Sequence, residues 1–162
     1  SLRVAGAREA LHRGIELAWS GSLARNWSLA AQATVLDAKT TRSPDATAIG
    51  KRTPNTAPLA LAANLGWQVP GINGLSWNNR LAWSDRKTVT ADESVELPAW
   101  WQLDTALTWR QRQGRNALTW RAGIDNVLDR RYWREAPTTY WGGTYLFPAQ
   151  PRTFRVSLQA GF

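Results

Sequence analysis

The stretch TFRVSLQAGF, residues 153–162, alternates apolar and polar side chains from its beginning to its end. Its apolar positions are Phe154, Val156, Leu158, Ala160 and Phe162. The positions between them carry Arg155, Ser157 and Gln159. This period-2 pattern predicts a β-strand with one apolar face and one polar face. An isolated strand is not stable, so the rest of the chain must supply its partners.

The same alternation recurs upstream and predicts about seven strands in all. They lie near residues 11–20, 26–38, 57–69, 74–86, 98–110, 116–126 and 152–162. One face of each strand carries large apolar residues, with Asn79 and Thr105 as the only interruptions. The opposite face carries polar residues, Ala or Gly. We expect an all-β, antiparallel sheet in which the strands at 116–126 and 152–162 are neighbours.

The connections between these strands alternate in length. Short ones lie near 21–25, 70–74 and 111–115, and long ones near 39–56, 87–97 and 127–151. Short turns on one side and long loops on the other are typical of an outer-membrane β-barrel, whose turns face the periplasm and whose loops face outside. A tilted strand of about ten residues also spans an apolar band of roughly 25 Å. We therefore predict a transmembrane β-barrel fragment.

Tryptophan is unusually frequent, with eleven Trp against three Phe and three Tyr. An indole is favoured where an apolar surface meets water. Six Trp fall on the apolar faces close to a short turn, and Phe162 ends its strand at the same level. We predict that these residues form a belt at the inner membrane–water interface: Trp19, Trp27, Trp67, Trp77, Trp109, Trp120 and Phe162.

Composition excludes several other functions. The chain has no Cys or Met and a single histidine, His12, so disulfides, thiolate metal sites and multi-histidine sites are ruled out within it. No run approaches the roughly 18 apolar residues of a membrane-spanning helix. We expect neither catalysis nor a resident cofactor. The net charge of +8 suits anionic partners but does not choose among nucleic acid, anionic lipid and an acidic ligand.

Two motifs near the end of the chain resemble a known family. RAGIDNVLDRRYW (residues 121–133) and YLFPAQPRTFRVSLQAGF (residues 145–162) resemble the end of TonB-dependent outer-membrane receptors, especially siderophore receptors. HRGIELAWSG (12–21), GKRTPNTAP (50–58) and LPAWWQLDTALTW (97–109) resemble the strand starts of the same family. The resemblance implies that residues 1–162 supply about the last third of a 22-stranded barrel. We expect the plug domain, the TonB-contacting segment and the other strands to lie before Ser1.

The resemblance also implies a function: import of a ferric siderophore across the outer membrane of a Gram-negative bacterium. TonB would act only through the missing amino-terminal region. Basic and aromatic loop residues are the candidate ligand contacts: Arg42, Arg52, Arg130, Arg131, Arg134, Tyr140, Trp141 and Tyr145. Other expected partners are outer-membrane lipid, lipopolysaccharide and the barrel assembly machinery. That machinery would read an assembly signal formed by Phe154, Val156, Leu158 and Phe162.

Alternatives remain at this point. Each basic residue could instead be a solvated charge or a lipopolysaccharide contact, and Asn126 and Asp129 suit the capping of a strand end. The cargo could be haem or cobalamin, and a passive porin would share the wall but lack a plug. A soluble basic β-domain that binds nucleic acid would carry its aromatics on the basic face. They lie on the other face, so we expect no nucleic-acid partner.

Overall fold

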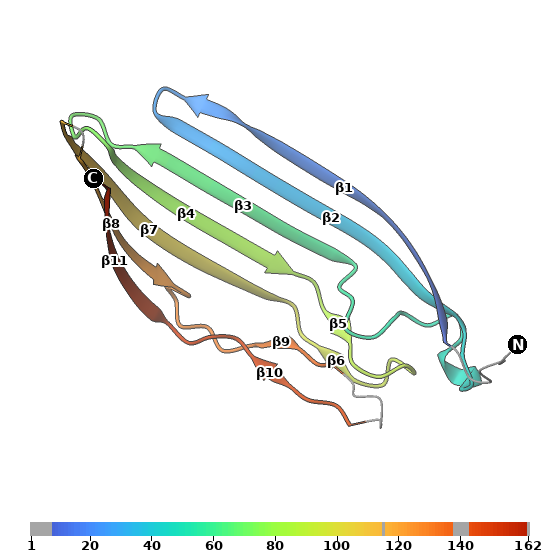
Figure 1. The fold of residues 1–162 in the computed structure, drawn as a ribbon. Helices are drawn as coiled ribbons and strands as arrows, with labels where there is room; N and C mark the ends of the chain where they lie inside the picture. The colour runs from blue at the N-terminus through green and yellow to red at the C-terminus, as the bar shows by residue number, and fades with distance from the viewer. Residues whose placement is uncertain (1–7, 115, 138–142, 162) are drawn as a thin grey trace, which may run out of the picture.

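The computed structural model describes residues 8–114, 116–137 and 143–161. Seven strands form one antiparallel sheet in the order β1-β2-β3-β4-β7-β8-β11 (Figure 1). Each strand is hydrogen-bonded to the strands next to it in this order. Their bounds are β1 Glu9–Ala24, β2 Trp27–Arg42, β3 Leu59–Gln68, β4 Leu75–Ser84, β7 Trp100–Gln113, β8 Asn116–Asp125 and β11 Thr153–Gly161. All seven predicted strands are confirmed, as is the pairing of β11 with β8.

The first two strands are longer than the alternation predicts. β1 and β2 pair from Glu9↔Arg42 to Ala24↔Trp27, well beyond the apolar positions. The turn between them is correspondingly tight, and Asn26 adopts φ 68° there. Asn tolerates this left-handed conformation better than most residues. The extra length lies mostly on the loop side, where polar residues such as Lys39 and Thr40 continue the ladder.

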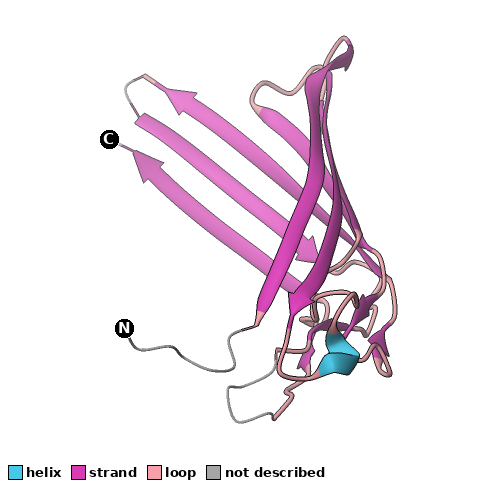
Figure 2. Ribbon diagram, turned by 90° about the vertical axis from the view of Figure 1, so that its right-hand side faces the viewer, coloured by secondary structure: helices cyan, strands magenta, loops and turns pink. Residues whose placement is uncertain are grey.

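The long connections gather at one end of the sheet (Figure 2). They contain two short hairpins, β5 (Lys87–Thr88) with β6 (Glu96–Leu97) and β9 (Trp133–Glu135) with β10 (Phe147–Pro148). A 3-10 turn, η1, covers Ala46–Ala48. Val89, Leu97 and Ala136 form a small buried cluster among these loops. No helix in the described part of the chain is long and apolar enough to cross a membrane.

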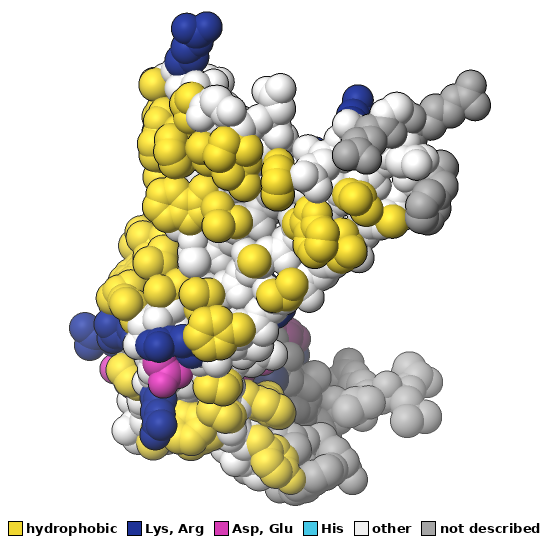
Figure 3. Space-filling model, turned by 90° about the vertical axis from the view of Figure 1, so that its left-hand side faces the viewer, with side chains coloured by type: hydrophobic (Ala, Val, Ile, Leu, Met, Phe, Trp, Pro, Cys, Tyr) yellow, Lys and Arg dark blue, Asp and Glu magenta, His cyan; other side chains and the backbone are white. Residues whose placement is uncertain are grey.

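The sheet has one continuous apolar face, and within the described ranges no second layer covers it. Figure 3 shows hydrophobic side chains gathered into a band with charged side chains near its ends. Phe154 and Val156 of β11 are 70% and 80% exposed, and Ile15 and Leu17 of β1 are 63% and 65% exposed. A soluble β-sandwich would bury such a face against a second sheet. The described part of the chain therefore does not form a two-sheet β-sandwich.

The two polar interruptions of the apolar face bond to each other. Asn79 of β4 and Thr105 of β7 are directly opposed. Thr105 Oγ1 donates to Asn79 Oδ1 at 2.8 Å, and it accepts from Trp77 Nε1 at 2.7 Å. Polar groups without water need such partners. The interruptions therefore keep the face compatible with an apolar surrounding.

Tryptophans on this face meet near the short turns. Trp27 stacks on Trp67 with centroids 5.5 Å apart, and Trp67 meets Trp77 edge-on at 6.4 Å. Trp109 and Trp120 are cross-strand partners, and their indole nitrogens donate to Asn73 O and Gln111 Oε1. Some of these rings thus pack on one another, and others donate hydrogen bonds near the short turns. Phe162 lies outside the described residues.

Candidate ligand-facing surface

The polar face of the sheet carries charged side chains that pair across neighbouring strands. Arg80 of β4 lies 3.7 Å from Asp104 of β7, and Arg155 of β11 forms an ion pair with Asp125 of β8. Arg121 of β8 donates to the amide of Gln159 at 3.4 Å. Alternation places these side chains opposite the apolar face. Asp104 thus makes a polar wall contact with Arg80, and Asp125 makes one with Arg155.

An aromatic stack closes the loop-side end of this polar face. Trp100, at the start of β7, lies against Tyr132 with ring centroids 4.6 Å apart. The Tyr132 hydroxyl donates to Gln102 Oε1 at 2.6 Å, and Gln102 Nε2 donates to Asp104 Oδ1 at 2.6 Å. Burial raises the pKa of Tyr132 above its ordinary value. The tyrosine hydroxyl is therefore joined through Gln102 to the Arg80–Asp104 pair.

Asn126 fixes the segment that carries Tyr132. Its side chain is buried, with 1% exposure for the residue. Its amide nitrogen donates to the carbonyls of Arg130 and Gln150, and its amide oxygen accepts from the Arg130 backbone N–H. Asp129 accepts from the Arg152 N–H at 2.9 Å. The prediction that Asn126 and Asp129 cap free backbone groups is confirmed.

Ion pairs within and between the loops, together with the residue Asn55, hold the loops in place. Lys51 lies 3.8 Å from Glu93, Arg86 lies 3.9 Å from Glu96, and the Arg52 N–H donates to Glu93 at 2.7 Å. Asn55 links two further loops, because its N–H donates to Thr88 O and its side chain accepts from the Ala136 N–H. Exposed ion pairs stabilise little individually. The buried cluster and Asn55 therefore set the loop arrangement.

Charged side chains act on Tyr132 of this aromatic stack and on the neighbouring loops. The charge of Arg134 acts on both Tyr132 and Lys87, lowering the pKa of each. The pKa of Lys87 falls below its ordinary value, mainly because of burial and despite the opposing effect of Glu135. Arg80 and Asp104 also act on the pKa of Tyr132, the cation lowering it and the carboxylate raising it. The loop-side end of the polar face thus offers aromatic rings and cationic donors to an anionic or oxygen-rich ligand.

The structure does not bring all the predicted ligand contacts to one place. The guanidinium of Arg130 lies 4.6 Å from the centroid of the Trp101 ring, and Trp101 belongs to the apolar face. Arg52 pairs directly with Lys39 in an isolated antiparallel bridge, also on the apolar side. Arg42 pairs with Glu9 at 3.3 Å at the outer end of β1 and β2. Arg131 and Tyr145 are exposed in the loops.

Tyr140 and Trp141 lie outside the described residues. Sequence reasoning did not select Trp100 and Gln102 as ligand candidates. Trp100 directly precedes Trp101, so the alternation itself puts the two rings on opposite faces. That parity was the signal that could have identified Trp100 as a residue of the polar face.

An antiparallel sheet with an uncovered apolar face, paired charges on the other face and tryptophans beside short turns defines the wall of a transmembrane β-barrel. The family model described as "TonB dependent receptor-like, beta-barrel" matches residues 3–127. The chain belongs to this family of outer-membrane β-barrels of Gram-negative bacteria. Its apolar face is accordingly the lipid-facing side, and its polar face lines the lumen.

Individual relatives agree with this assignment. The chain is 29% identical over 154 residues to the ferrichrome receptor FcuA of Yersinia enterocolitica, covering 95% of this chain and 20% of the relative. BauA, the ferric preacinetobactin receptor of Acinetobacter baumannii, matches with a TM-score of 0.80 at 21% identity, covering 94% of this chain and 22% of BauA. The ferric yersiniabactin uptake receptor FyuA of Yersinia pestis matches with a TM-score of 0.76 at 19% identity, covering 96% of this chain and 24% of FyuA. The chain thus spans about a fifth of the length of these proteins.

Proposed function

We propose that the full-length gene product binds a ferric siderophore outside the cell and imports it across the outer membrane with energy from TonB. Family membership supports the transport class, and the relative FcuA is named as a ferrichrome receptor. The solved structures BauA and FyuA are likewise named as receptors for ferric siderophores. Of the three alternatives, a soluble β-domain, a passive porin and a receptor, the receptor accounts for both the family match and the fold.

The observation that carries the proposal is the Tyr132–Trp100 stack at the loop-side end of the lumen, where the charges of Arg134 and Arg80 act on the tyrosine. A ferric chelate presents oxygen atoms around a metal and often carries flat chelating groups. Guanidinium and ammonium groups donate hydrogen bonds to such oxygens, and aromatic rings stack on flat groups. We place the ligand against Arg80, Lys87, Tyr132 and Arg134.

The predicted contacts divide between the two sides of the wall. Arg42, Arg131, Arg134, Tyr140, Trp141 and Tyr145 stay as proposed ligand contacts. Arg52 and Arg130 instead serve the lipid-facing side in this proposal, because their partners lie there. We also retain the proposal that Phe154, Val156, Leu158 and Phe162 form the surface that the barrel assembly machinery reads.

Uptake of radioactive iron tests the function. Cells lacking the chromosomal gene receive the full-length gene on a plasmid, and ferrichrome is the first probe of a panel of ferric siderophores. We expect uptake of at least one siderophore to depend on both the gene and TonB. Growth supported only by haem or cobalamin, or uptake that persists without TonB, would contradict the proposal.

A matched pair of variants tests the site. Arg134→Gln should lower siderophore binding about three- to tenfold, because it removes a donor beside Tyr132. Arg130→Gln removes the same charge four residues earlier, but on the Trp101 side of the wall. Its binding should stay within about twofold of the parent. Equal losses in both variants would show that the ligand surface is placed wrongly.

A further inference from the structure

We infer that the lumen face carries a track of arginines along which an anionic ferric chelate moves from the loops toward the short turns. The arginine track consists of Arg155 of β11, Arg121 of β8, and Arg110 and Arg112 of β7. The inference rests on the proposed function and adds two properties to it. These are the charge class of the cargo and its path along the wall.

Strand register orders the arginine track from one end of the sheet to the other. Arg155 lies two residues after the loop-side start of β11. Arg121 pairs with the residue two positions further along β11, so it is a diagonal neighbour of Arg155. Arg110 is diagonal to Arg121 in the same sense, and Arg112 lies one residue before the turn-side end of β7. Diagonal neighbours are about 7–8 Å apart, within reach of long side chains. The arginine track therefore extends from the loop side to the turn side.

Alternation assigns the arginine track to the lumen face. Trp109 and Trp120 are cross-strand partners on the apolar face, so the adjacent Arg110 and Arg121 project to the other side. Arg112, two residues beyond Arg110, projects to the same side. The four guanidinium groups thus face the space through which cargo would pass, and not the lipid.

Carboxylates accompany the arginine track only at its loop-side end. The acidic residues on the lumen face of β7, β8 and β11 are Asp104 and Asp125. Asp104 pairs with Arg80, and Asp125 pairs with Arg155. Among the ion pairs of the described residues, none includes the other three arginines of the track. Positive charge is therefore in excess from the middle of the wall to the turns. Such a wall attracts anions and holds them at several weak sites in place of one strong site.

A hollow of about 680 Å³ lies beside the loop-side half of the arginine track. Its lumen-side lining consists of Ala106, Thr108, Arg121, Gly123, Arg155 and Ser157. Ala106 and Gly123 are directly opposed, and a Cβ on Gly123 would lie 3.4 Å from the Ala106 Cβ. The small side chains leave space in front of the wall, while the guanidinium groups beside it can donate to the oxygen atoms of a chelate.

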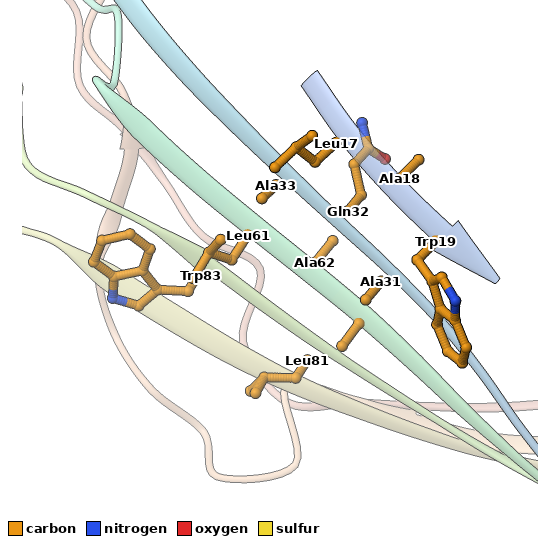
Figure 4. A pocket seen from close by; sticks show the side chains of 11 residues that line it. Leu17, Ala18, Trp19, Ala31, Gln32, Ala33, Leu61, Ala62, Leu81 and Trp83 are labelled. Carbon is orange, nitrogen blue, oxygen red and sulfur yellow. The ribbon is translucent and has the colours of Figure 1, made fainter. Parts of the chain in front are cut away.

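The lumen face of β2 and β3 offers an anion no such partners. At the positions where these strands pair, it carries only uncharged residues: Ser28, Ala30, Gln32, Thr34, Ala60, Ala62, Asn64 and Gly66. Gln32 and Ala62, both labelled in Figure 4, are an opposed pair in this neutral wall. A neutral chelate gains little from the arginine track over the neutral wall. An anionic chelate gains several charge-assisted hydrogen bonds, so the arginine track selects the charge of the cargo and places its path along β11, β8 and β7.

Thiol modification tests the arginine track without any cargo. The full-length gene product is expressed in intact cells, with any cysteine outside residues 1–162 replaced. It carries either Ser157→Cys, opposite Arg121, or the matched lumen substitution Ser28→Cys in the neutral wall. The probes are sulfonatoethyl methanethiosulfonate, which is anionic, and trimethylammonioethyl methanethiosulfonate, which is cationic. The ratio of anionic to cationic reaction rates should be about fivefold higher for Ser157→Cys, and adding R110Q/R121Q should remove that difference.

Two results of this experiment would overturn the inference. The first is an equal rate ratio for the two cysteine substitutions, because the arginines would then create no local excess of anions. The second is a lack of reaction of Ser157→Cys with either reagent, because another part of the gene product would then cover the arginine track.

Uptake of two iron complexes tests the charge class of the cargo. The probes are a ferric tris-catecholate, which is anionic, and a ferric tris-hydroxamate, which is neutral. R110Q/R121Q should lower uptake of the anionic complex about fivefold, while its binding to the cells stays within about twofold of the parent. R110K/R121K keeps the charges and should restore most of the uptake. The control R13Q/R25Q removes two arginines outside the track and should transport as the parent does.

The possible failures of the two proposals differ. Uptake of the neutral complex alone by the parent would overturn the inference, and so would an equal loss for both complexes in R110Q/R121Q, since the arginines would then serve the protein and not the cargo. Uptake of no ferric siderophore by the parent would contradict the proposed function, and the thiol rate ratios would still decide whether the track attracts anions. If R110Q/R121Q fails to insert, R121Q alone should lower uptake of the anionic complex about two- to threefold, and unchanged uptake would overturn the inference.

Discussion

Trp100 and Tyr132 stack with their ring centroids 4.6 Å apart and their planes 13° apart. The contact joins the first residue of β7 to the segment that follows β8. Because Tyr132 also donates to Gln102, the stack and the lumen wall form one unit. Changes at Tyr132 should therefore loosen this loop segment and leave the sheet intact.

Tyr132→Phe and Tyr132→Ala separate the hydroxyl from the ring. The Phe variant loses one hydrogen bond and should destabilise the segment 126–135 by about 1 kcal/mol. The Ala variant also loses the stack and should cost about 2–3 kcal/mol. Hydrogen exchange of peptides covering this segment measures both effects. Equal exchange in the two variants would show that the ring contributes nothing beyond its hydroxyl.

The same tyrosine should respond to alkaline pH. Burial raises the pKa of Tyr132 above 10.0 in the folded protein, so the folded state holds the phenolic proton more tightly than the unfolded state. Its contribution to stability is complete below pH 10 and is lost as the pH rises through the raised pKa. The difference in absorbance at about 295 nm between the parent protein and the Tyr132→Phe variant should show one tyrosine that ionises at a higher pH than free tyrosine. Ionisation at or below the free value would contradict the burial.

Asn126→Ala should disrupt the turn after β8. It leaves the Arg130 N–H and the carbonyls of Arg130 and Gln150 without their partner. It also puts Ala at φ 51°, where Asn is better tolerated. We expect a local loss of about 2–4 kcal/mol. Protease sensitivity of the loop 127–137 measures it, with the exposed Asn116→Ala as the control that should not change.

Two glycines of one short turn offer a matched comparison. Gly71 and Gly74 have φ of 81° and 78°. A Cβ on Gly74 would lie 2.0 Å from the Arg110 carbonyl oxygen, whereas a Cβ on Gly71 meets no atom within 4 Å. Gly71→Ala should cost about 1 kcal/mol from strain alone, and Gly74→Ala at least about 3 kcal/mol. Urea unfolding of the full-length barrel in detergent compares them, and equal midpoints would refute the contact.

Sequence alone predicted the wall but only part of the ligand-facing surface. The alternation in segments such as 59–68 fixes which side chains share a face, because the period of a strand is two. Loops have no such period. Nothing in RRYWRE, residues 130–135, indicates that Arg130 lies on Trp101 while Tyr132 lies on Trp100. Those contacts join residues about 30 positions apart, and they depend on how Asn126 and Asn55 fold the loops.

The Asn79–Thr105 pair has a consequence for how the wall assembles. Its hydrogen bonds exist in one alignment of β4 against β7 only, and a slip of two residues would leave both polar groups unpaired and facing hydrocarbon at a cost of several kcal/mol. We expect the pair to stabilise the native strand register and to disfavour misaligned insertion intermediates. The apolar double variant N79L/T105V would remove that penalty. It should yield more misassembled barrel, seen as loss of the heat-modifiable folded band, although each substitution makes the surface a better match for lipid.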